Sequence, residues 1–243
     1  MKADGSNDQD RIPNDPLRRR VVSAVIKRLL DVVLSAAALV LLAPPFLLVA
    51  LAIKMDSRGP VFHRGVRVGK GGKIFRIYKL RSMVSDAEVR GGPSTPADDP
   101  RITRMGRIVR RYNLDELAQF INTLLGDMSI VGPRPEVPEV VALYSESDRE
   151  TILSVRPGIT DWATLWIRDE GERLKGSSDP HQRYLDEIWP EKRRLQLKYV
   201  HEQSVMADLR IMLLTFKVHF GGGHASDGIV QVLQQAPTGD PSS

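Results

Sequence analysis

Two adjacent carboxylates, Asp115 and Glu116, follow two arginines in the segment RRYNLDELAQFI, which covers residues 110–121. Asn113 and Glu116 have the spacing of a helix capping box, and Asp115 would interact favourably with the positive end of a helix. Carboxylates are also ligands for Mg²⁺, and an aspartate can attack phosphorus to form a covalent intermediate. The segment by itself therefore leaves two interpretations open, an ordinary helix start and a reactive site.

Basic residues around this pair favour phosphate as the ligand of such a site. Arginine can hold a phosphate through two parallel hydrogen bonds, and the prolines on either side of Arg134 restrict its backbone. A run of positive charge is often only a solvated surface, so part of this set has no role in binding. The basic residues concerned are Lys79, Arg81, Arg134 and the five arginines between residues 101 and 111.

A long apolar run precedes these residues. Residues 27–54 read KRLLDVVLSAAALVLLAPPFLLVALAIK, and residues 32–53 carry no charge, which is long enough for a helix to cross a hydrocarbon core of about 30 Å. Pro44 and Pro45 each remove a backbone donor in its middle and predict a break or sharp kink. Basic residues flank both ends, which favours the cytoplasmic side for each. A kinked single-pass helix and a re-entrant helix broken at Pro44-Pro45 both stay open.

The rest of the chain predicts an α+β domain that is mainly helical. The segment GPVFHRGVRVGKGGKIFRIYKLRSM predicts a small β-hairpin whose turn is KGGK, residues 70–73. Residues 85–100 are expected to form a polar loop, and RPGIT (156–160) a turn. Apolar spacing predicts helices over residues 102–112 and 114–125, the second ending near Gly126, and amphipathic interfacial helices over residues 184–220.

The composition excludes several kinds of site. The chain has no cysteine, which excludes disulfides and thiolate chemistry, and its five histidines include no pair at i,i+4, so a zinc site is not expected. The net charge of +5 suits polyanions, membrane surfaces or phosphorylated substrates. We expect a disordered, basic-ended tail over residues 1–24, a membrane helix over 25–57, a catalytic domain over 58–220 and a disordered tail over 221–243. The polar N-terminus is not that of a cleavable signal peptide.

The order and spacing of these segments closely resemble the bacterial sugar transferases, also known as monotopic polyprenyl-phosphate phosphoglycosyl transferases. The resemblance covers roughly residues 27–218. It is carried by the apolar run, the hairpin segment ending in YKLRSM, RITRMGRIVRRYNLDELAQFINTLLGDMSIVGPRPE, VRPGIT and DLRIMLLTFKV. It implies the minimal, single-domain form of this family.

The resemblance implies an enzyme that transfers a sugar 1-phosphate from a UDP-sugar to a polyprenyl phosphate, typically undecaprenyl phosphate, and releases UMP. Asp115 would be the nucleophile that forms a phosphosugar–aspartyl intermediate. Glu116 would assist in binding the cofactor Mg²⁺, held by both carboxylates, and in proton handling. The basic positions of the family map to Lys79, with Arg81 as a second candidate, and to Arg110 and Arg134. The reaction would initiate exopolysaccharide, capsule, O-antigen or glycoprotein glycan synthesis.

The resemblance also implies a re-entrant helix with both ends at the cytoplasmic face of the bacterial inner membrane. Membrane lipids would be partners, nucleic acid would not, and a homo-oligomer is left open. Three features depart from many relatives: Pro44-Pro45 stands where Ser-Pro is common, Asp161 replaces glycine in PGITDW, and residues 167–192 differ from the shortest members. We expect the segment after residue 160 to help select the sugar, whose identity the sequence does not give.

Two rival functions make different predictions. A conventional glycosyltransferase would move the sugar without its phosphate and would release UDP instead of UMP. A non-catalytic, membrane-anchored basic module would bind anionic lipid or acidic polymer and would tolerate Asp115→Asn, while salt would weaken its binding.

Overall fold

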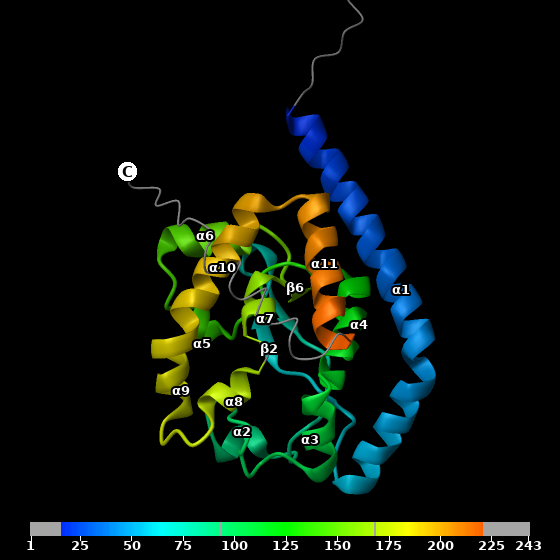
Figure 1. Cartoon of the computed structure of the whole chain (residues 1–243), viewed down its shortest axis with the longest axis vertical. Helices are drawn as coiled ribbons and strands as arrows, with labels where there is room; N and C mark the ends of the chain where they lie inside the picture. The colour runs from blue at the N-terminus through cyan, green and yellow to red at the C-terminus, as the bar shows by residue number, and fades with distance from the viewer. Residues whose placement is uncertain (1–15, 93, 168, 221–243) are drawn as a thin grey trace, which may run out of the picture.

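The computed structural model describes residues 16–92, 94–167 and 169–220. A long helix, α1 (Pro16–Asp56), runs along one flank of a mainly helical body (Figure 1). In the described residues the body also contains three two-stranded sheets. The expected α+β class is therefore confirmed. Of the tails expected over residues 1–24 and 221–243, residues 1–15 and 221–243 lie outside the described residues, whereas residues 16–24 were expected to be disordered and instead form the first part of α1.

Helix α1 forms because leucine and alanine, which are strong helix formers, dominate its apolar run. It is one continuous helix that includes Pro44 and Pro45, so of the predicted break or sharp kink the break is not seen. Figure 1 shows that α1 instead changes direction in its C-terminal, lighter blue part. A bend accommodates the proline rings and their missing donors without ending the helix.

Polar residues attach the N-terminal half of α1 to the body. Lys27 Nζ lies 2.7 Å from Asp208 Oδ2. Asp31 is buried, and its Oδ1 accepts a hydrogen bond from the backbone N–H of Ile130 at 2.9 Å. A buried carboxylate in this position is costly unless it is hydrogen-bonded, so Asp31 fixes this part of α1 against the segment that contains Ile130.

A second attachment holds the C-terminal end of α1. Arg81 is buried, and its guanidinium donates hydrogen bonds to the backbone carbonyls of Ser57, at 2.8 Å, and of Arg58. Asp56 Oδ2 accepts a hydrogen bond from the backbone N–H of Met105 at 2.9 Å. Both ends of the apolar part of α1 are therefore tied to the same body.

Short strands form three separate pairs. The predicted hairpin is confirmed: β2 (Val66–Val68) pairs antiparallel with β3 (Ile74–Arg76) around the 3-10 turn η1 (Lys70–Gly72). Strand β1 (Phe62–His63) pairs antiparallel with β4 (Lys79–Leu80). Strand β5 (Ser129–Val131) pairs in parallel with β6 (Gly158–Thr160), where only a turn was expected.

Most other helices are short and surround these sheets. Gly126, with φ of 92°, ends α4 as predicted, and a four-residue helix, α2, interrupts the expected polar loop. The helices are α2 (Ala87–Arg90), α3 (Arg104–Arg111), η2 (Leu114–Ala118), α4 (Gln119–Leu125), α5 (Pro138–Val141), α6 (Glu146–Leu153), α7 (Trp162–Trp166), α8 (Glu170–Leu174), α9 (Pro180–Arg183), η3 (Tyr184–Ile188), α10 (Trp189–Glu202) and α11 (Val205–Phe220).

The largest hydrophobic core lies between α7, α10, α11 and the β5–β6 pair. Trp162, Leu195 and Ile211 are buried in it. Tyr199 is fully buried, and its hydroxyl lies 3.0 Å from the carbonyl oxygen of Val131 and donates to the carboxylate of Asp208. This core fixes β5, and the chain that leaves β5 leads directly into the functional site.

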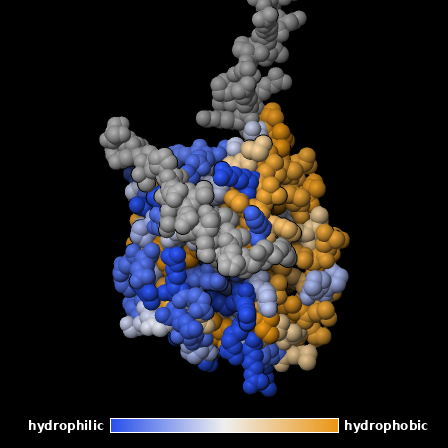
Figure 2. All heavy atoms as spheres, viewed as in Figure 1, coloured by the Kyte–Doolittle hydropathy of each residue, from blue (hydrophilic) through white to orange (hydrophobic). Residues whose placement is uncertain are grey.

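One side of the molecule is strongly apolar. Figure 2 shows apolar side chains gathered over the side on which α1 lies. Leu41 and Leu48 of α1 are 76% and 70% exposed, and Leu213 and Phe216 of α11 are 70% and 64% exposed. By length and composition, α1 is long and apolar enough to cross a membrane. Exposed apolar surface of this extent marks a contact with a membrane or another protein.

Candidate active site

The segment LDEL does not begin an ordinary α-helix. Asn113 has a left-handed backbone with φ of 50°, and residues 114–118 form the 3-10 turn η2 before α4 begins. The side chain of Asn113 makes no capping hydrogen bond, so the predicted capping box is not formed. Asparagine tolerates this backbone better than most residues, and the turn places Asp115 and Glu116 before the first residue of α4.

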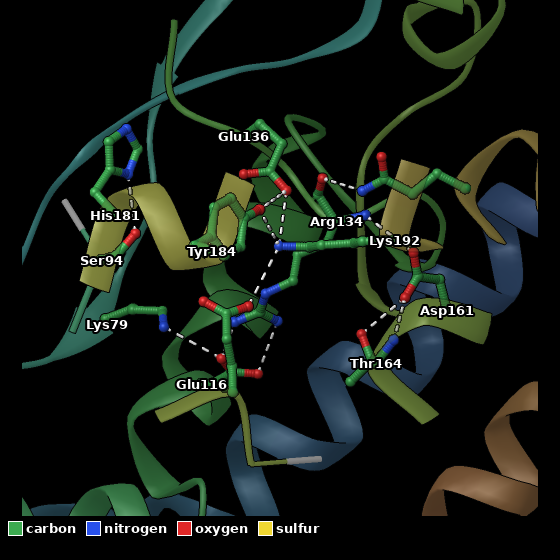
Figure 3. A network of polar contacts seen from close by, with 12 residues as sticks. Lys79, Ser94, Glu116, Arg134, Glu136, Asp161, Thr164, His181, Tyr184 and Lys192 are labelled. Carbon is green, nitrogen blue, oxygen red and sulfur yellow. Dashed lines mark hydrogen bonds and ion pairs between the residues drawn. The ribbon is translucent and has the colours of Figure 1, made fainter. Parts of the chain in front are cut away.

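The two carboxylates instead meet two cations from distant parts of the chain (Figure 3). Lys79 Nζ, from β4, lies 3.2 Å from Glu116 Oε1 and 3.5 Å from Asp115 Oδ2. Arg134 binds Glu116 through both guanidinium nitrogens: Nη1 donates to Oε2 at 3.0 Å, and Nη2 donates to Oε1. The structure therefore brings together four of the predicted site residues.

The two buried carboxylates have pKa values that are shifted in opposite directions. Burial raises the pKa of Asp115, and the nearby charge of Lys79 offsets this rise only in part. Burial also acts to raise the pKa of Glu116, but the charges and hydrogen bonds of Arg134 and Lys79 outweigh it and hold that pKa well below its usual range. Glu116 is therefore held in its ionised form, and Asp115 is the carboxylate with the higher pKa and the greater basicity.

Arg134 occupies a tightly built loop after β5. Gly132 and Gly158 face one another across the β5–β6 pair, and a Cβ on Gly132 would lie 2.4 Å from the carbonyl oxygen of Arg156. Only glycine allows this close approach of the two backbones. Pro133 and Pro135 flank Arg134 and limit its backbone freedom. The loop therefore presents the guanidinium at a defined position.

The other two predicted phosphate-binding residues lie differently. Arg110 is half-buried, and its charge helps to lower the pKa of Asp115, but within the described ranges it makes no ion pair of its own. Arg81 does not join the cluster, because its guanidinium is bound to backbone carbonyls at the end of α1. Strand β4 ends at Leu80, so the alternation that would have placed Arg81 on the same face as Lys79 does not continue.

A second buried network lies beside the first and was not predicted. Lys192 Nζ lies 2.8 Å from Glu136 Oε1 and donates to the hydroxyl of Tyr184 at 3.0 Å (Figure 3). Burial acts to lower the pKa of Lys192, but the charge of Glu136 outweighs it and raises that pKa. Ile188, Lys192, Leu195 and Tyr199 follow helical spacing, so a lysine on an apolar helix face was the available signal.

The oxygen ligands of the site fit Mg²⁺. Mg²⁺ is typically held by one or two carboxylates together with substrate phosphates, and Asp115 and Glu116 supply adjacent carboxylates. No group of three or more His, Cys, Asp or Glu side chains that could hold a metal ion occurs in the described residues. Mg²⁺ commonly completes its coordination with oxygens of a phosphate substrate. This is the usual arrangement for Mg²⁺ in phosphoryl transfer.

Comparison with known proteins identifies the family. The profile described as Bacterial sugar transferase matches residues 22–222. The chain is 41% identical over 197 residues to the "Exopolysaccharide production protein PSS" of Rhizobium leguminosarum bv. phaseoli, an alignment that covers 79% of this chain and 93% of that relative. The chain belongs to the bacterial sugar transferase family, which confirms the resemblance of its motifs.

Two further relatives are longer proteins. The chain is 39% identical over 210 residues to the "Undecaprenyl-phosphate glucose phosphotransferase" of Komagataeibacter xylinus, covering 83% of this chain. It is 37% identical over 200 residues to the "UDP-glucose:undecaprenyl-phosphate glucose-1-phosphate transferase" of Escherichia coli (strain K12), covering 80% of this chain. The alignments span 37% and 40% of the length of these two relatives.

Proposed function

We propose that this protein transfers a sugar 1-phosphate from a UDP-sugar to undecaprenyl phosphate and releases UMP. The observation that carries the proposal is the unequal pair of carboxylates: Glu116 is bound by Arg134 and Lys79, whereas Asp115 has a raised pKa and one ion pair at 3.5 Å. A buried aspartate with raised basicity beside two cations has the chemistry of a nucleophile for an anionic phosphorus centre. Relatives named for this reaction support the same assignment.

The reaction would proceed in two displacements. In the first, Asp115 attacks the β-phosphorus of the UDP-sugar, and the bond from this phosphorus to the bridging oxygen breaks to release UMP. In the second, a phosphate oxygen of undecaprenyl phosphate attacks the same phosphorus and the Asp115 carboxylate leaves. The products are the undecaprenyl-diphosphate sugar and the free enzyme, so ping-pong kinetics are expected.

The protein's own residues would supply positioning and charge. Lys79 and Arg134 would hold the phosphate oxygens near Asp115, and Glu116 would keep both cations in place. Asp115 and Glu116 would hold Mg²⁺, which would neutralise charge on the diphosphate when bound. Arg110 is a third cation near Asp115, whereas the contacts of Arg81 support only a structural role at the end of α1.

We further propose that α1 is re-entrant and lies in the bacterial inner membrane with the body on the cytoplasmic face. The support is that Lys27 and Asp31 near one end, and Ser57 and Arg58 near the other, contact the same body. A single folded body cannot lie on both sides of a membrane, so both ends of α1 belong on one side. The exposed apolar residues between the attachments would enter the lipid.

This topology can be tested with single cysteines, because the natural chain has none. We expect Ser23→Cys and Met55→Cys to react with a membrane-impermeant thiol reagent in inverted vesicles, and neither to react in right-side-out vesicles. Leu41→Cys should be protected in both. Labelling of Ser23→Cys and Met55→Cys from opposite sides would show a single-pass helix instead.

The activity can be tested by separating the nucleotide products. The protein in nanodiscs with Mg²⁺ would be given a panel of UDP-sugars with and without undecaprenyl phosphate, and UMP and UDP would be measured separately. We expect lipid-dependent UMP from one or two donors, and a loss of roughly 10⁴-fold or more in Asp115→Asn. Asp148→Asn, which changes an ion-paired carboxylate on α6, is the matched control.

The other outcomes point to the rival functions. UDP as the product would indicate a conventional glycosyltransferase. No nucleotide release by folded protein, with lipid binding unchanged in Asp115→Asn, would indicate a non-catalytic module.

A further inference from the structure

Arg134 is held through its backbone as well as through its guanidinium. Its N–H donates to Asp161 Oδ2 at 3.3 Å, and its carbonyl oxygen accepts a hydrogen bond from Gln196 Nε2 at 3.1 Å (Figure 3). Asp161 and Gln196 are both fully buried. Asp161 is the N-cap of α7 and Gln196 lies in α10, so two separate elements bind the backbone N–H and the carbonyl oxygen of the same arginine.

Asp161 divides its two oxygens between two tasks. Oδ1 caps α7 by accepting from the backbone N–H of Thr164 at 2.7 Å and from its hydroxyl at 2.8 Å, while Oδ2 accepts from Arg134. Capping alone needs one acceptor, which serine, threonine or asparagine would provide. An asparagine has only one oxygen, so it cannot accept at both places. The two-sided contact therefore requires a carboxylate.

The partner on the other side is also fixed. Gln196 Oε1 accepts a hydrogen bond from the hydroxyl of Tyr144 at 3.0 Å, which orients the amide so that its nitrogen faces Arg134. Rotation of the Arg134 backbone would break a buried hydrogen bond on one side or the other. Together with the two neighbouring prolines, these contacts fix the backbone from which the Arg134 side chain reaches Glu116.

We propose that Asp161 is a positioning residue that acts through Arg134: it sets the angle at which the guanidinium meets Glu116 and the donor phosphate. This inference rests on the proposed phosphosugar transfer. It gives Asp161 a role different from sugar selection, the role expected from sequence for the segment after residue 160. A residue that acts through a phosphate ligand affects every UDP-sugar by a common factor, because the phosphates are shared among donors.

A double-mutant cycle tests whether Asp161 acts through Arg134. We expect Asp161→Asn to lower kcat/KM for the donor by about 10- to 100-fold. In the Arg134→Lys background the same substitution should lower it by less than about 3-fold, because lysine cannot form the bidentate contact whose orientation Asp161 would set. Rates would be measured as UMP release. Thr164→Val is the matched control, since it removes one hydrogen bond to the same carboxylate without touching Arg134.

Each outcome has a defined meaning. The inference is supported if Asp161→Asn strongly lowers kcat/KM and this loss becomes smaller in the Arg134→Lys background. Thr164→Val should have the same Tm as Asp161→Asn and remain active. Three results would overturn the inference while the transfer reaction itself stands. They are losses of kcat/KM that multiply in the double variant of Asp161 and Arg134, an equal loss of kcat/KM in Thr164→Val, and a changed order of preferred UDP-sugars. Absence of UMP release by the wild type would overturn the proposed function. If Asp161→Asn does not fold, Gln196→Leu enters the same cycle with the same expectation.

Discussion

Two buried charge clusters lie side by side in this fold, and they are built differently. In the first, a single cation, Lys192, lies 2.8 Å from Glu136, 3.6 Å from Glu170 and 3.0 Å from the Tyr184 hydroxyl. In the second, Glu116 accepts both hydrogen bonds of the Arg134 guanidinium and makes the shorter contact with Lys79, whereas Asp115 lies 3.5 Å from Lys79. One cluster surrounds a single cation with several acceptors, and the other directs most of the contacts of two cations to one of two carboxylates.

We expect this difference to separate a structural role from a reactive one. In the Lys192 cluster the charges stabilise each other, and the pKa of Lys192 is raised in favour of its charged form. In the other cluster Arg134 and Lys79 hold the pKa of Glu116 low, whereas burial raises the pKa of Asp115. Burial, by itself, does not predict reactivity, since both clusters are buried. We expect the unequal sharing of partners to do so.

The largest expected effect is on stability, in the Lys192 cluster. Lys192→Met leaves the carboxylate of Glu136 buried without its partner, so we expect the free energy of unfolding to fall by about 3–5 kcal/mol. We expect kcat, measured below the Tm, to stay within about threefold of wild type, because the structure gives Lys192 no direct contact with Asp115 or Glu116. Chemical denaturation and UMP release check the two quantities.

A double variant controls this prediction. Lys192→Met combined with Glu136→Leu removes both charges, so most of the lost stability should return. A kcat lowered a hundredfold in folded Lys192→Met would contradict the separation between the clusters and would place Lys192 in the reactive one.

The next effect is on the rate, in the unequal cluster. Glu116→Gln removes the charge that holds Arg134 and Lys79, so both cations become free to bind Asp115 and weaken it as a nucleophile. We expect kcat to fall roughly 10²-fold, which corresponds to about 2.7 kcal/mol of activation free energy. Burst amplitudes of UMP would show whether the first displacement is the slowed step. A variant with wild-type kcat would show that unequal sharing has no catalytic consequence.

Sequence motifs predict the reactive cluster better than the structural one. Lys79, Asp115, Glu116 and Arg134 lie in short segments with distinctive neighbours, and the structure brings them together. The capping box at Asn113 was wrong because local spacing does not reveal a stronger partner for Glu116, and Arg134 from a distant loop is that partner. Long-range competition of this kind is absent from any short window.

The same limit applies to the fold. The hairpin and the end of α4 at Gly126 follow from turn residues, which act locally, and were predicted. The parallel β5–β6 pair was missed because three-residue strands carry too little alternation to be read. Arg81 was assigned to phosphate because its carbonyl partners at the end of α1 are visible only when α1 is folded against the body.

The smallest expected effect is a shift in pH dependence, which sharpens the comparison most directly. Asp115 must be ionised to attack, so kcat/KM should fall as the pH drops through its pKa, which burial places above the ordinary 3.8. Glu116 stays ionised through this range, since its pKa is held low. Lys79→Met removes the charge that lowers the pKa of Asp115, so this acid limb should move to higher pH; a fixed limb would show that another group titrates.

Stability should respond to the same proton with the opposite sign from a salt-bridged carboxylate. Between 3.8 and the raised pKa of Asp115, the folded state binds this proton more tightly than the unfolded chain, so its contribution to the free energy of unfolding falls as the pH rises. Asp115→Asn removes that fall, and the variant should have a higher Tm than wild type at neutral pH while it is inactive. Replacing a carboxylate that is paired as Glu136 is with Lys192 would destabilise the folded protein. A lower Tm in Asp115→Asn would therefore mean that Asp115, too, is a structural partner.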